Sequence, residues 1–365
     1  MTPHDDLDDI WSFGSREQCS KAAQTPTFQI EHIGSVEPLD AQFGLDHPKT
    51  VPEPLSELFF GQPGPSELAM MGGEPDKVPP LQTYAILDAA KVTNFVEMLE
   101  ASSLEHCCLF KGDAEDELKN VAPWIVRLEE GNAFTRNLFT RSEAPWHLWD
   151  SEPGIYLRSR STLEDMRKHF RKFIKLKSID EKWFYFRFWE ASVIPAFLSE
   201  IDVEQQARFQ GLFCGTDSAP IAEIYFISVR TRCCTTVKGH PLSTSGNLKL
   251  PIQIKLTEED FTDLAKAMRT TFFKRMRQDF EDRALAQYGM SKSDFSTYYG
   301  RTLRKAADYQ MVTEKDVASF VYVTFEQGIT FWDKPDVMKI TSDKHLKSSH
   351  RVMDAILYRL KKGDL

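Results

Sequence analysis

The sequence predicts a protein of mixed α and β structure, in which an N-terminal α/β lobe precedes a helical C-terminal lobe. Three observations lead to this prediction. Between residues 81 and 200, short apolar runs alternate with amphipathic segments. From residue 257 onward, apolar residues recur at helical spacing behind repeated N-cap signatures. A chain of 365 residues is also long enough for about two domains.

Changes in composition divide the chain into four segments. Residues 1–80 hold 4 basic and 14 acidic side chains and 11 of the 19 prolines. We expect this acidic leader to be largely disordered, because it offers little apolar surface to offset the entropy of ordering. Its apolar islands, residues 10–13 and 55–60, have the composition to dock on the folded body or on a partner. The leader is followed by an α/β domain over 81–200, a β-containing connector over 201–256 and a helical lobe over 257–365.

Within the α/β domain, apolar runs and capping signals predict each element in order. We expect strands at residues 84–87, 107–110, 124–128, 155–158 and 183–188, and helices around residues 92–99, 133–139 and 163–174. The last strand, W-F-Y-F-R-F-W, carries large side chains on both faces, which is typical of a strand buried on both sides. Because strands alternate with helices, the sheet is expected to be mostly parallel or mixed.

The helix over residues 163–174 is predicted to have one strongly basic face. Ser161 and Glu164 have the spacing of a capping box, and Leu163, Met166 and Phe170 form part of one apolar stripe. Between residues 156 and 177 there are eight basic and two acidic side chains, although the whole chain has a net charge of -9. This local reversal of sign calls for an anionic partner, which is either another protein or the acidic leader itself. The candidate partner-binding residues are Arg158, Arg160, Arg167, Lys168, Arg171, Lys172, Lys175 and Glu190.

The sequence contains none of the common catalytic signatures, so we expect a protein that is not an enzyme and that uses no cofactor. Phosphate-binding loops, dinucleotide-binding glycine turns, zinc-binding H-E-x-x-H helices and nucleophile elbows are all missing from it. One alternative is an enzyme whose site joins Asp88, at the end of the first strand, to His169 and Glu190. A second alternative is a nucleic-acid-binding protein that uses the basic helix over 162–176.

Cysteine usage and hydropathy indicate the compartment. The six cysteines lack the spacing of a metal site or of a disulfide framework, and we expect reduced core thiols. No apolar run approaches the length of a membrane span, and the acidic N-terminus does not resemble a secretory signal. The sequence therefore predicts a cytoplasmic protein.

Five blocks of the sequence resemble domain-of-unknown-function family 4123 (DUF4123), in the order that this family shows. The blocks are YAILDAAK (84–91), LFKG (109–112), VAPWIVRLEE (121–130), GIYLRSRSTLEDMRKHFRKFI (154–174) and WFYFRFWEASVIPAFL (183–198). Residues 306–332 are similar to part of the helical lobes that accompany this domain. The chain departs from the family pattern where Glu190-Ala191-Ser192 replaces D-P-R and where Tyr309-Gln310-Met311 replaces Y-G-I.

The resemblance implies a role in bacterial type VI secretion. Members of this family are adaptor chaperones that hold a toxic effector protein and help to load it onto the valine-glycine repeat (VgrG) spike of the secretion machine. The implied partners are therefore the effector, encoded nearby, and the spike protein. From its residues we expect no membrane partner, and we favour a protein partner over the nucleic acid of the second alternative.

Overall fold

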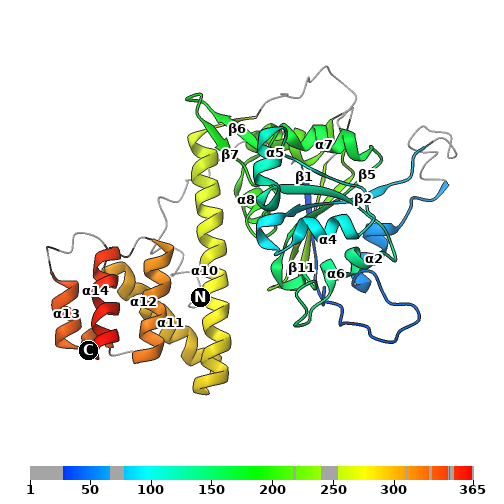
Figure 1. Cartoon of the computed structure of the whole chain (residues 1–365). Coiled ribbons are helices and arrows are strands. Elements are labelled where there is room, and N and C mark those ends of the chain that lie inside the picture. The colour runs from blue at the N-terminus through cyan, green and yellow to red at the C-terminus, as the bar shows by residue number, and fades with distance from the viewer. Residues whose placement is uncertain are drawn as a thin grey trace. The chain divides into compact units, whose positions relative to one another are not determined.

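The computed structural model describes residues 28–65, 78–216, 219–239, 254–309, 311, 313–328, 331–343, 345 and 349–363 (Figure 1). It has two compact units, Ala23–Met268 and a second unit that contains Arg269–Leu365. The predicted class of mixed α and β structure is confirmed, because the described residues of the first unit form sheets and helices and those of the second form helices. The predicted apolar island at residues 10–13 lies outside the described residues.

A seven-stranded sheet forms the centre of the first unit, with the strand order β1-β11-β10-β5-β2-β4-β3. Each neighbouring pair in this sheet is antiparallel, so the expectation of a mostly parallel or mixed sheet is wrong. The strands are β1 (Phe28–Ile33), β2 (Gln82–Asp88), β3 (His106–Cys108), β4 (Pro123–Leu128), β5 (Gly154–Ser159), β10 (Glu223–Ser228) and β11 (Cys233–Gly239).

The alternation of strands and helices predicts the crossovers correctly but not the strands that lie between them. β2 and β3 are both antiparallel to β4, so they run in the same direction and the helix α4 (Phe95–Ala101) connects them across it. In the same way, β4 and β5 run parallel to each other with β2 between them. Such split β-α-β arrangements give an antiparallel sheet from an alternating sequence, because each crossover leaves room for a reversed strand.

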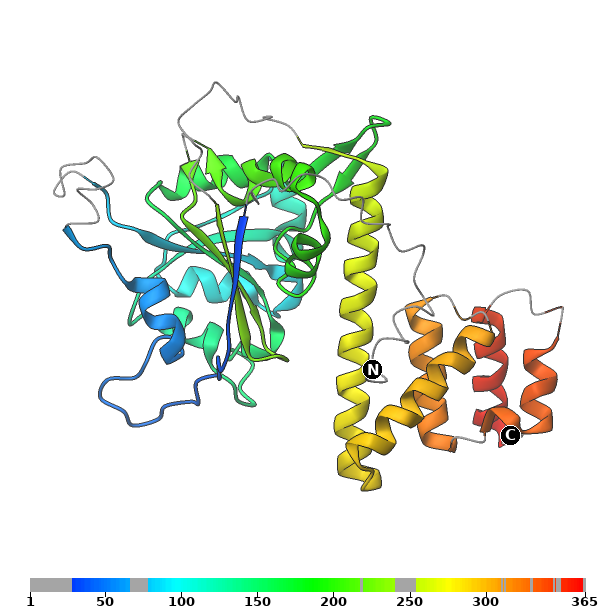
Figure 2. The same ribbon diagram turned by 180° about the vertical axis from the view of Figure 1, so that it is seen from behind.

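Helices cover both faces of this sheet (Figures 1 and 2). Successive side chains of β2 point to opposite faces, so Tyr84 and Ile86 join one apolar core whereas Ala85 and Leu87 join the other. The first core includes buried side chains of α7 (Leu163–Arg171), α8 (Ile194–Glu200) and α9 (Val203–Phe213). The second includes side chains of α2 (Glu53–Phe60), α4 and α6 (Ala133–Phe139).

The N-terminal segment contributes to the fold, so the prediction of a largely disordered leader is wrong for residues 28–65. β1 pairs with β11 over six residue pairs, and Leu55 and Phe59 of α2 are fully buried. Residues 55–60 thus dock on the folded body, one of the two possibilities that their composition allows. The composition of the leader does not predict this strand, because the strand that pairs with β1 is formed by residues 233–239, far along the chain.

The predicted connector over residues 201–256 belongs to the same fold. β10 and β11 lie between β1 and β5 in the main sheet, and α9 packs against one of its faces. β8 (Gly215–Thr216) and β9 (Ala219–Pro220) form a two-stranded sheet. Short helices complete the unit: α5 (Asp113–Leu118), η2 (Ala89–Lys91), η3 (Lys119–Val121) and η4 (Trp149–Ser151).

A second, three-stranded sheet contains the aromatic strand and has the order β12-β6-β7. Its strands are β6 (Lys175–Ser178), β7 (Trp183–Tyr185) and β12 (Lys255–Leu256). The expectation of a single strand over 183–188 buried on both sides is wrong. All three residues of β7 are exposed, and only the aromatic residues that follow it, Phe186, Phe188 and Trp189, are buried.

The second unit confirms the predicted helical lobe. Its helices are the C-terminal part of α10 (Glu258–Tyr288), α11 (Lys292–Asp308), α12 (Glu314–Gln327), η5 (Phe331–Asp333), α13 (Pro335–Thr341) and α14 (Ser349–Lys362). The predicted caps are present, because Ser291 accepts a hydrogen bond from the Asp294 N–H and Thr313 accepts one from the Asp316 N–H. A buried Phe320–Trp332 ring stack lies in the core of this unit.

Candidate protein-binding surface

Helix α7 carries the predicted basic face and begins at Leu163 as the sequence indicates, although it ends at Arg171 and its N-cap is one residue later than predicted. Thr162, rather than Ser161, is the N-cap, and its hydroxyl accepts a hydrogen bond from the Asp165 N–H at 3.2 Å. Met166 and Phe170 are fully buried, as the apolar stripe predicts. Between them, His169 is also buried, and burial together with the nearby Lys172 lowers its pKa to about 4. His169 therefore stays neutral near pH 7 as a packing residue.

Two of the predicted cations donate hydrogen bonds to main-chain carbonyls, Arg158 from a buried position and Arg160 from a half-buried one. Arg158 is 3% exposed, and its guanidinium donates hydrogen bonds to the carbonyls of Leu58 and Gly61, both at 2.6 Å. Arg160 donates to the carbonyl of Pro79. These arginines anchor the N-terminal segment, so the interpretation of Arg158 as a partner-binding residue is wrong.

Arg167 also has internal partners. Its Nε donates to the Cys108 carbonyl at 3.0 Å, and its guanidinium forms ion pairs with Glu115 at 3.5 Å and Glu164 at 3.8 Å. Lys168 is more open, with its side chain 64% exposed and 3.6 Å from Glu164.

The remaining predicted cations lie toward the C-terminal end of α7 and at the start of β6. Arg171 is half-buried, whereas Lys172 and Lys175 are exposed. Within the described part of the chain, none of these three side chains forms an ion pair. Positive charge without an internal counterion is therefore concentrated next to the β6–β7 hairpin.

The β6–β7 hairpin has one open face built from two lysines and two aromatic rings. In the antiparallel register, Lys175 is opposite Tyr185 and Lys177 is opposite Trp183. Each ammonium lies over the ring opposite, 4.9 Å from the Tyr185 centroid and 5.1 Å from the Trp183 centroid. Trp183 and Tyr185 are 58% and 59% exposed.

The other face of the hairpin is largely covered, although Phe184 keeps 37% of its surface exposed. Leu176 and Ser178 are buried, and the Phe184 ring lies 4.7 Å from that of Phe261. The sequence-based prediction missed this hairpin, although Lys175-Leu176-Lys177-Ser178 alternates polar and small or apolar residues with a period of two. That period is the signal of a strand with one buried face.

An exposed ion-pair bridge fixes the hairpin to β12. The Glu181 carboxylate lies 2.7 Å from the Lys177 ammonium and 2.5 Å from the Lys255 ammonium. Hydrogen bonds donated by Lys177 and Lys255 lower the pKa of Glu181 to about 2. The bridge joins the turn of the hairpin to the neighbouring strand in the same sheet.

The two carboxylates of the enzyme hypothesis meet in a separate polar cluster. Asp88 is 2% exposed, and it accepts hydrogen bonds from Arg187 at 2.6 Å and from the Trp189 indole at 3.1 Å. Arg187 also contacts Glu190 at 2.5 Å, and Glu190 lies 2.8 Å from the Lys91 ammonium. Glu190 thus has two cationic partners within the fold, Arg187 and Lys91.

The electrostatics of this cluster favour a structural role. Burial raises the pKa of Glu190, but the hydrogen bonds from Lys91 and Arg187 outweigh it and leave the pKa lowered. Asp88 also caps η2 by accepting from the Ala90 N–H at 2.9 Å. His169 instead contacts Leu212 and the rings of Phe170 and Phe173, so the contacts of these residues do not assemble the Asp88–His169–Glu190 site.

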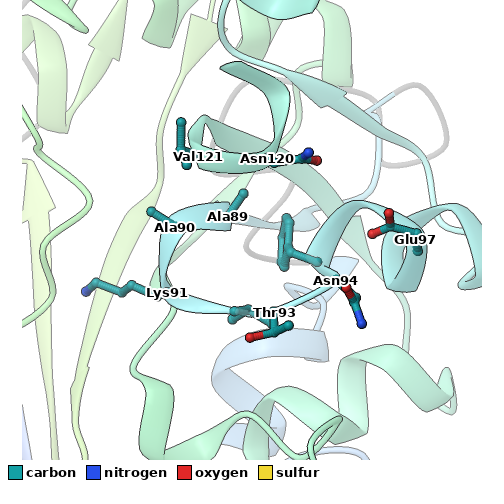
Figure 3. Close-up of a pocket in the computed structure, with 10 residues that line it drawn as sticks. Ala89, Ala90, Lys91, Thr93, Asn94, Glu97, Asn120 and Val121 are labelled. Carbon is teal, nitrogen blue, oxygen red and sulfur yellow. The ribbon is translucent and has the colours of Figure 1, made fainter. Parts of the chain in front are cut away.

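A pocket of about 350 Å³ shares Lys91 with this cluster, and its lining residues are drawn in Figure 3. Its wall is formed mainly by η2, the start of α4 and η3, and Lys91 and Glu97 are its only charged lining residues. No histidine or cysteine lines it. Across the described residues, no group of three or more His, Cys, Asp or Glu side chains is placed to hold a metal ion. The pocket therefore offers no recognisable catalytic constellation.

Comparison with known families agrees with the resemblance expected over residues 82–200. Residues 83–208 match the model of the family described as Domain of unknown function (DUF4123). Searches of curated proteins and of solved structures found no match. In the described part of the chain, no helix is both long enough and apolar enough to cross a membrane.

The matched segment runs from β2 into α9, and it contains α7, the β6–β7 hairpin and the Asp88–Arg187–Glu190 cluster. Over this segment, the chain is similar to the DUF4123 family.

Proposed function

We propose that the protein is a non-enzymatic adaptor chaperone that binds a type VI secretion effector and helps to load it onto the valine-glycine repeat spike. The observation that carries this proposal is the open face of the β6–β7 hairpin, within the DUF4123 segment. Trp183 and Tyr185 are each more than half exposed there, beneath Lys177 and Lys175. Exposed aromatic side chains beside cations are typical of the energetic centres of protein interfaces.

The state of the carboxylates supports a binding role over a catalytic one. A general base needs a carboxylate that is free to take a proton at the working pH. Asp88 and Glu190 are instead held by Arg187 and Lys91 at 2.5–2.8 Å. An arginine–carboxylate network of this kind more often stabilises a fold than performs chemistry.

Co-purification tests the proposal. The full-length chain, carrying an affinity tag, is expressed in its own bacterium, and the co-purified proteins are quantified by mass spectrometry. We expect recovery of a toxin encoded near the adaptor gene and of the spike protein. Combined replacement of Trp183 and Tyr185 by alanine should reduce toxin recovery at least about tenfold, the loss expected for interface hot spots.

The matched control is Trp146→Ala, because Trp146 is 51% exposed and lies outside the hairpin. This variant should recover the toxin at the wild-type level. Recovery of neither a toxin nor the spike protein by the unmodified chain would refute the adaptor proposal.

One observation also favours a second candidate, the binding of single-stranded nucleic acid. Exposed aromatic rings next to lysines can stack on bases while the lysines contact phosphates. Fluorescence anisotropy with a labelled single-stranded DNA distinguishes the two, because nucleic-acid affinity falls steeply with salt. Tight binding at physiological salt that is lost on replacing Trp183 and Tyr185 would favour this candidate over the adaptor.

A further inference from the structure

The outer edge of β7 has open main-chain hydrogen-bonding groups. The Phe186 N–H donates to the Ile174 carbonyl at 2.9 Å, and the Ser178 N–H donates to the Lys182 carbonyl at 2.9 Å. In an antiparallel ladder, residues alternate between facing the partner strand and facing away from it. Lys182, Phe184 and Phe186 therefore face β6 through their main chain, whereas Trp183 and Tyr185 direct their N–H and C=O groups outward.

No strand covers this edge within the described residues. β7 is the last strand of the order β12-β6-β7, while the outer edge of β6 is already paired with β12. The exposed side chains of Trp183 and Tyr185 show that the same residues are open to solvent. An open edge of this kind is a template for the addition of a further strand.

Charge indicates which strand fits. Residues 171–182 carry five basic and two acidic side chains, in a chain with a net charge of -9. One of those acids, Glu181, is already bridged by Lys177 and Lys255. A second copy of this hairpin would bring like charges together, whereas an acidic segment would be attracted.

We infer that the open edge of β7 accepts an extended, acidic segment of the effector as an added strand, an inference that rests on the proposed adaptor function. Main-chain hydrogen bonds to Trp183 and Tyr185 hold the segment in register. Its residues opposite these two share their face and come close to Lys175 and Lys177, so carboxylates are favoured there. The residue opposite Phe184 points to the other face, where Phe184 is 37% exposed, so an apolar side chain is favoured. The recognised pattern alternates acidic and apolar residues.

Synthetic peptides test the sequence pattern directly. The probes are fluorescein-labelled hexapeptides: Glu-Val-Glu-Val-Glu-Val, its block isomer Glu-Glu-Glu-Val-Val-Val, and Lys-Val-Lys-Val-Lys-Val. Binding to the full chain is measured by fluorescence anisotropy. We expect the alternating acidic peptide to bind at least about tenfold more tightly than either control, because only it satisfies both charge and register. Equal binding of the three peptides would overturn the inference.

A pair of variants separates main-chain pairing from side-chain contact. Tyr185→Ala removes the ring and keeps the N–H, whereas Tyr185→Pro also removes the outward N–H. Proline is tolerated on an edge strand where the N–H faces solvent, so both variants should fold, which circular dichroism checks. Strand addition predicts that Tyr185→Pro binds the alternating peptide about five- to tenfold more weakly than Tyr185→Ala. Equal affinities of the two variants would show that the edge is not used.

The charge contribution has its own matched pair. Lys175→Glu, on the hairpin face, should weaken binding of the acidic peptide at least about fivefold. Lys168→Glu, on the exposed side of α7, should leave it unchanged. Equal effects of the two substitutions would show that the peptide is attracted by the overall electrostatic field of the protein, and would overturn the inference that it binds along β7.

Two further outcomes would name a different occupant and so overturn the inference. Tighter peptide binding after replacing Asp5, Asp6, Asp8 and Asp9 by asparagine would assign the edge to the protein's own acidic N-terminus. A dimer in light scattering that Tyr185→Pro dissociates would assign it to a second copy. If the effector is co-purified by the full chain while the β7 variants bind like wild type, the adaptor function stands and only the strand-addition site fails.

Discussion

Replacement of Phe59 by alanine tests whether the N-terminal segment is an integral part of the first unit. Phe59 is fully buried, and its ring centroid lies 5.6, 5.3 and 5.1 Å from those of Phe139, Tyr156 and Tyr225. The other three rings come from α6, β5 and β10, so this one side chain joins the N-terminal segment to the sheet.

The expected loss of stability is large. Truncating a buried phenylalanine to alanine costs about 3–5 kcal/mol in lost burial and cavity formation. For a unit of this size, each 1 kcal/mol lowers the melting temperature by about 2–4 °C, so a fall of about 6–20 °C is expected. Phe43→Ala, on the same segment but 90% exposed, should change the free energy of unfolding by less than about 0.5 kcal/mol.

Urea denaturation measures the lost free energy of unfolding, and a separate hydrogen-exchange experiment with mass spectrometry shows which unit has lost it. Exchange in peptides from β2 and β5 should increase in Phe59→Ala, while Phe43→Ala should leave it unchanged. A cost below about 1 kcal/mol for Phe59→Ala, or equal effects of the two substitutions, would show that the segment does not belong to the core.

Three other predictions concern polar contacts of the first unit. Arg187→Ala should destabilise this unit by about 1–3 kcal/mol, because it leaves the buried Asp88 carboxylate without its charged partner. A double-mutant cycle with Asp88→Asn, measured by urea denaturation, should show coupling between the two substitutions, and strict additivity would contradict the network. The pKa of Glu181 in the folded state is about 2, below its usual value of 4.5. The stabilisation from its two ion pairs is therefore present above pH 4.5 and is lost as the pH falls toward 2. An NMR titration should show this pKa, and Lys255→Ala should raise it. Arg158→Met should destabilise the unit by about 1–3 kcal/mol, because it removes the donor of the Gly61 carbonyl and leaves the Leu58 carbonyl with the Tyr225 hydroxyl alone. The same replacement of the exposed Lys168 should change the urea midpoint little.

Local signals in the sequence predict the elements of this fold well. Two examples are the apolar stripe through Met166 and Phe170 and the caps at Ser291 and Thr313. In each, the interacting residues lie within one or two helical turns of one another. Short-range geometry and side-chain chemistry determine such features, so a single sequence contains what is needed to predict them.

The errors concern partners that lie far apart in the chain. Arg167 lies off the apolar stripe of α7, yet it donates to Cys108 of β3, a contact that no periodicity within α7 can indicate. β1 was assigned to a disordered leader because its partner, β11, lies near residue 235. The aromatic composition of β7 suggested burial, but its exposure depends on the hairpin register with β6 and on where the sheet ends.

The candidate surface was predicted in part. Sequence alone located the positive charge between residues 156 and 177, and it named Lys175 correctly as an exposed cation. It could not show that Arg158 is buried against the carbonyls of the N-terminal segment, or that Arg160 donates to the Pro79 carbonyl. It also missed Trp183 and Tyr185, because an aromatic side chain on a strand is more often buried than exposed.

The position of β5 within the sheet has a practical consequence for isolating the family domain. Residues 83–208 contain most of β2 and all of β3, β4 and β5, but β10 pairs with β5 from outside that range, and β11 and β1 follow it. A fragment cut at the family boundaries would present β5 as a bare apolar edge and would remove Phe59 and Tyr225 from around Tyr156. Such a fragment should aggregate on expression, whereas one that begins before Phe28 and extends to Met268 retains all seven strands. The family boundaries thus mark a recurring sequence segment that is shorter than the unit of folding.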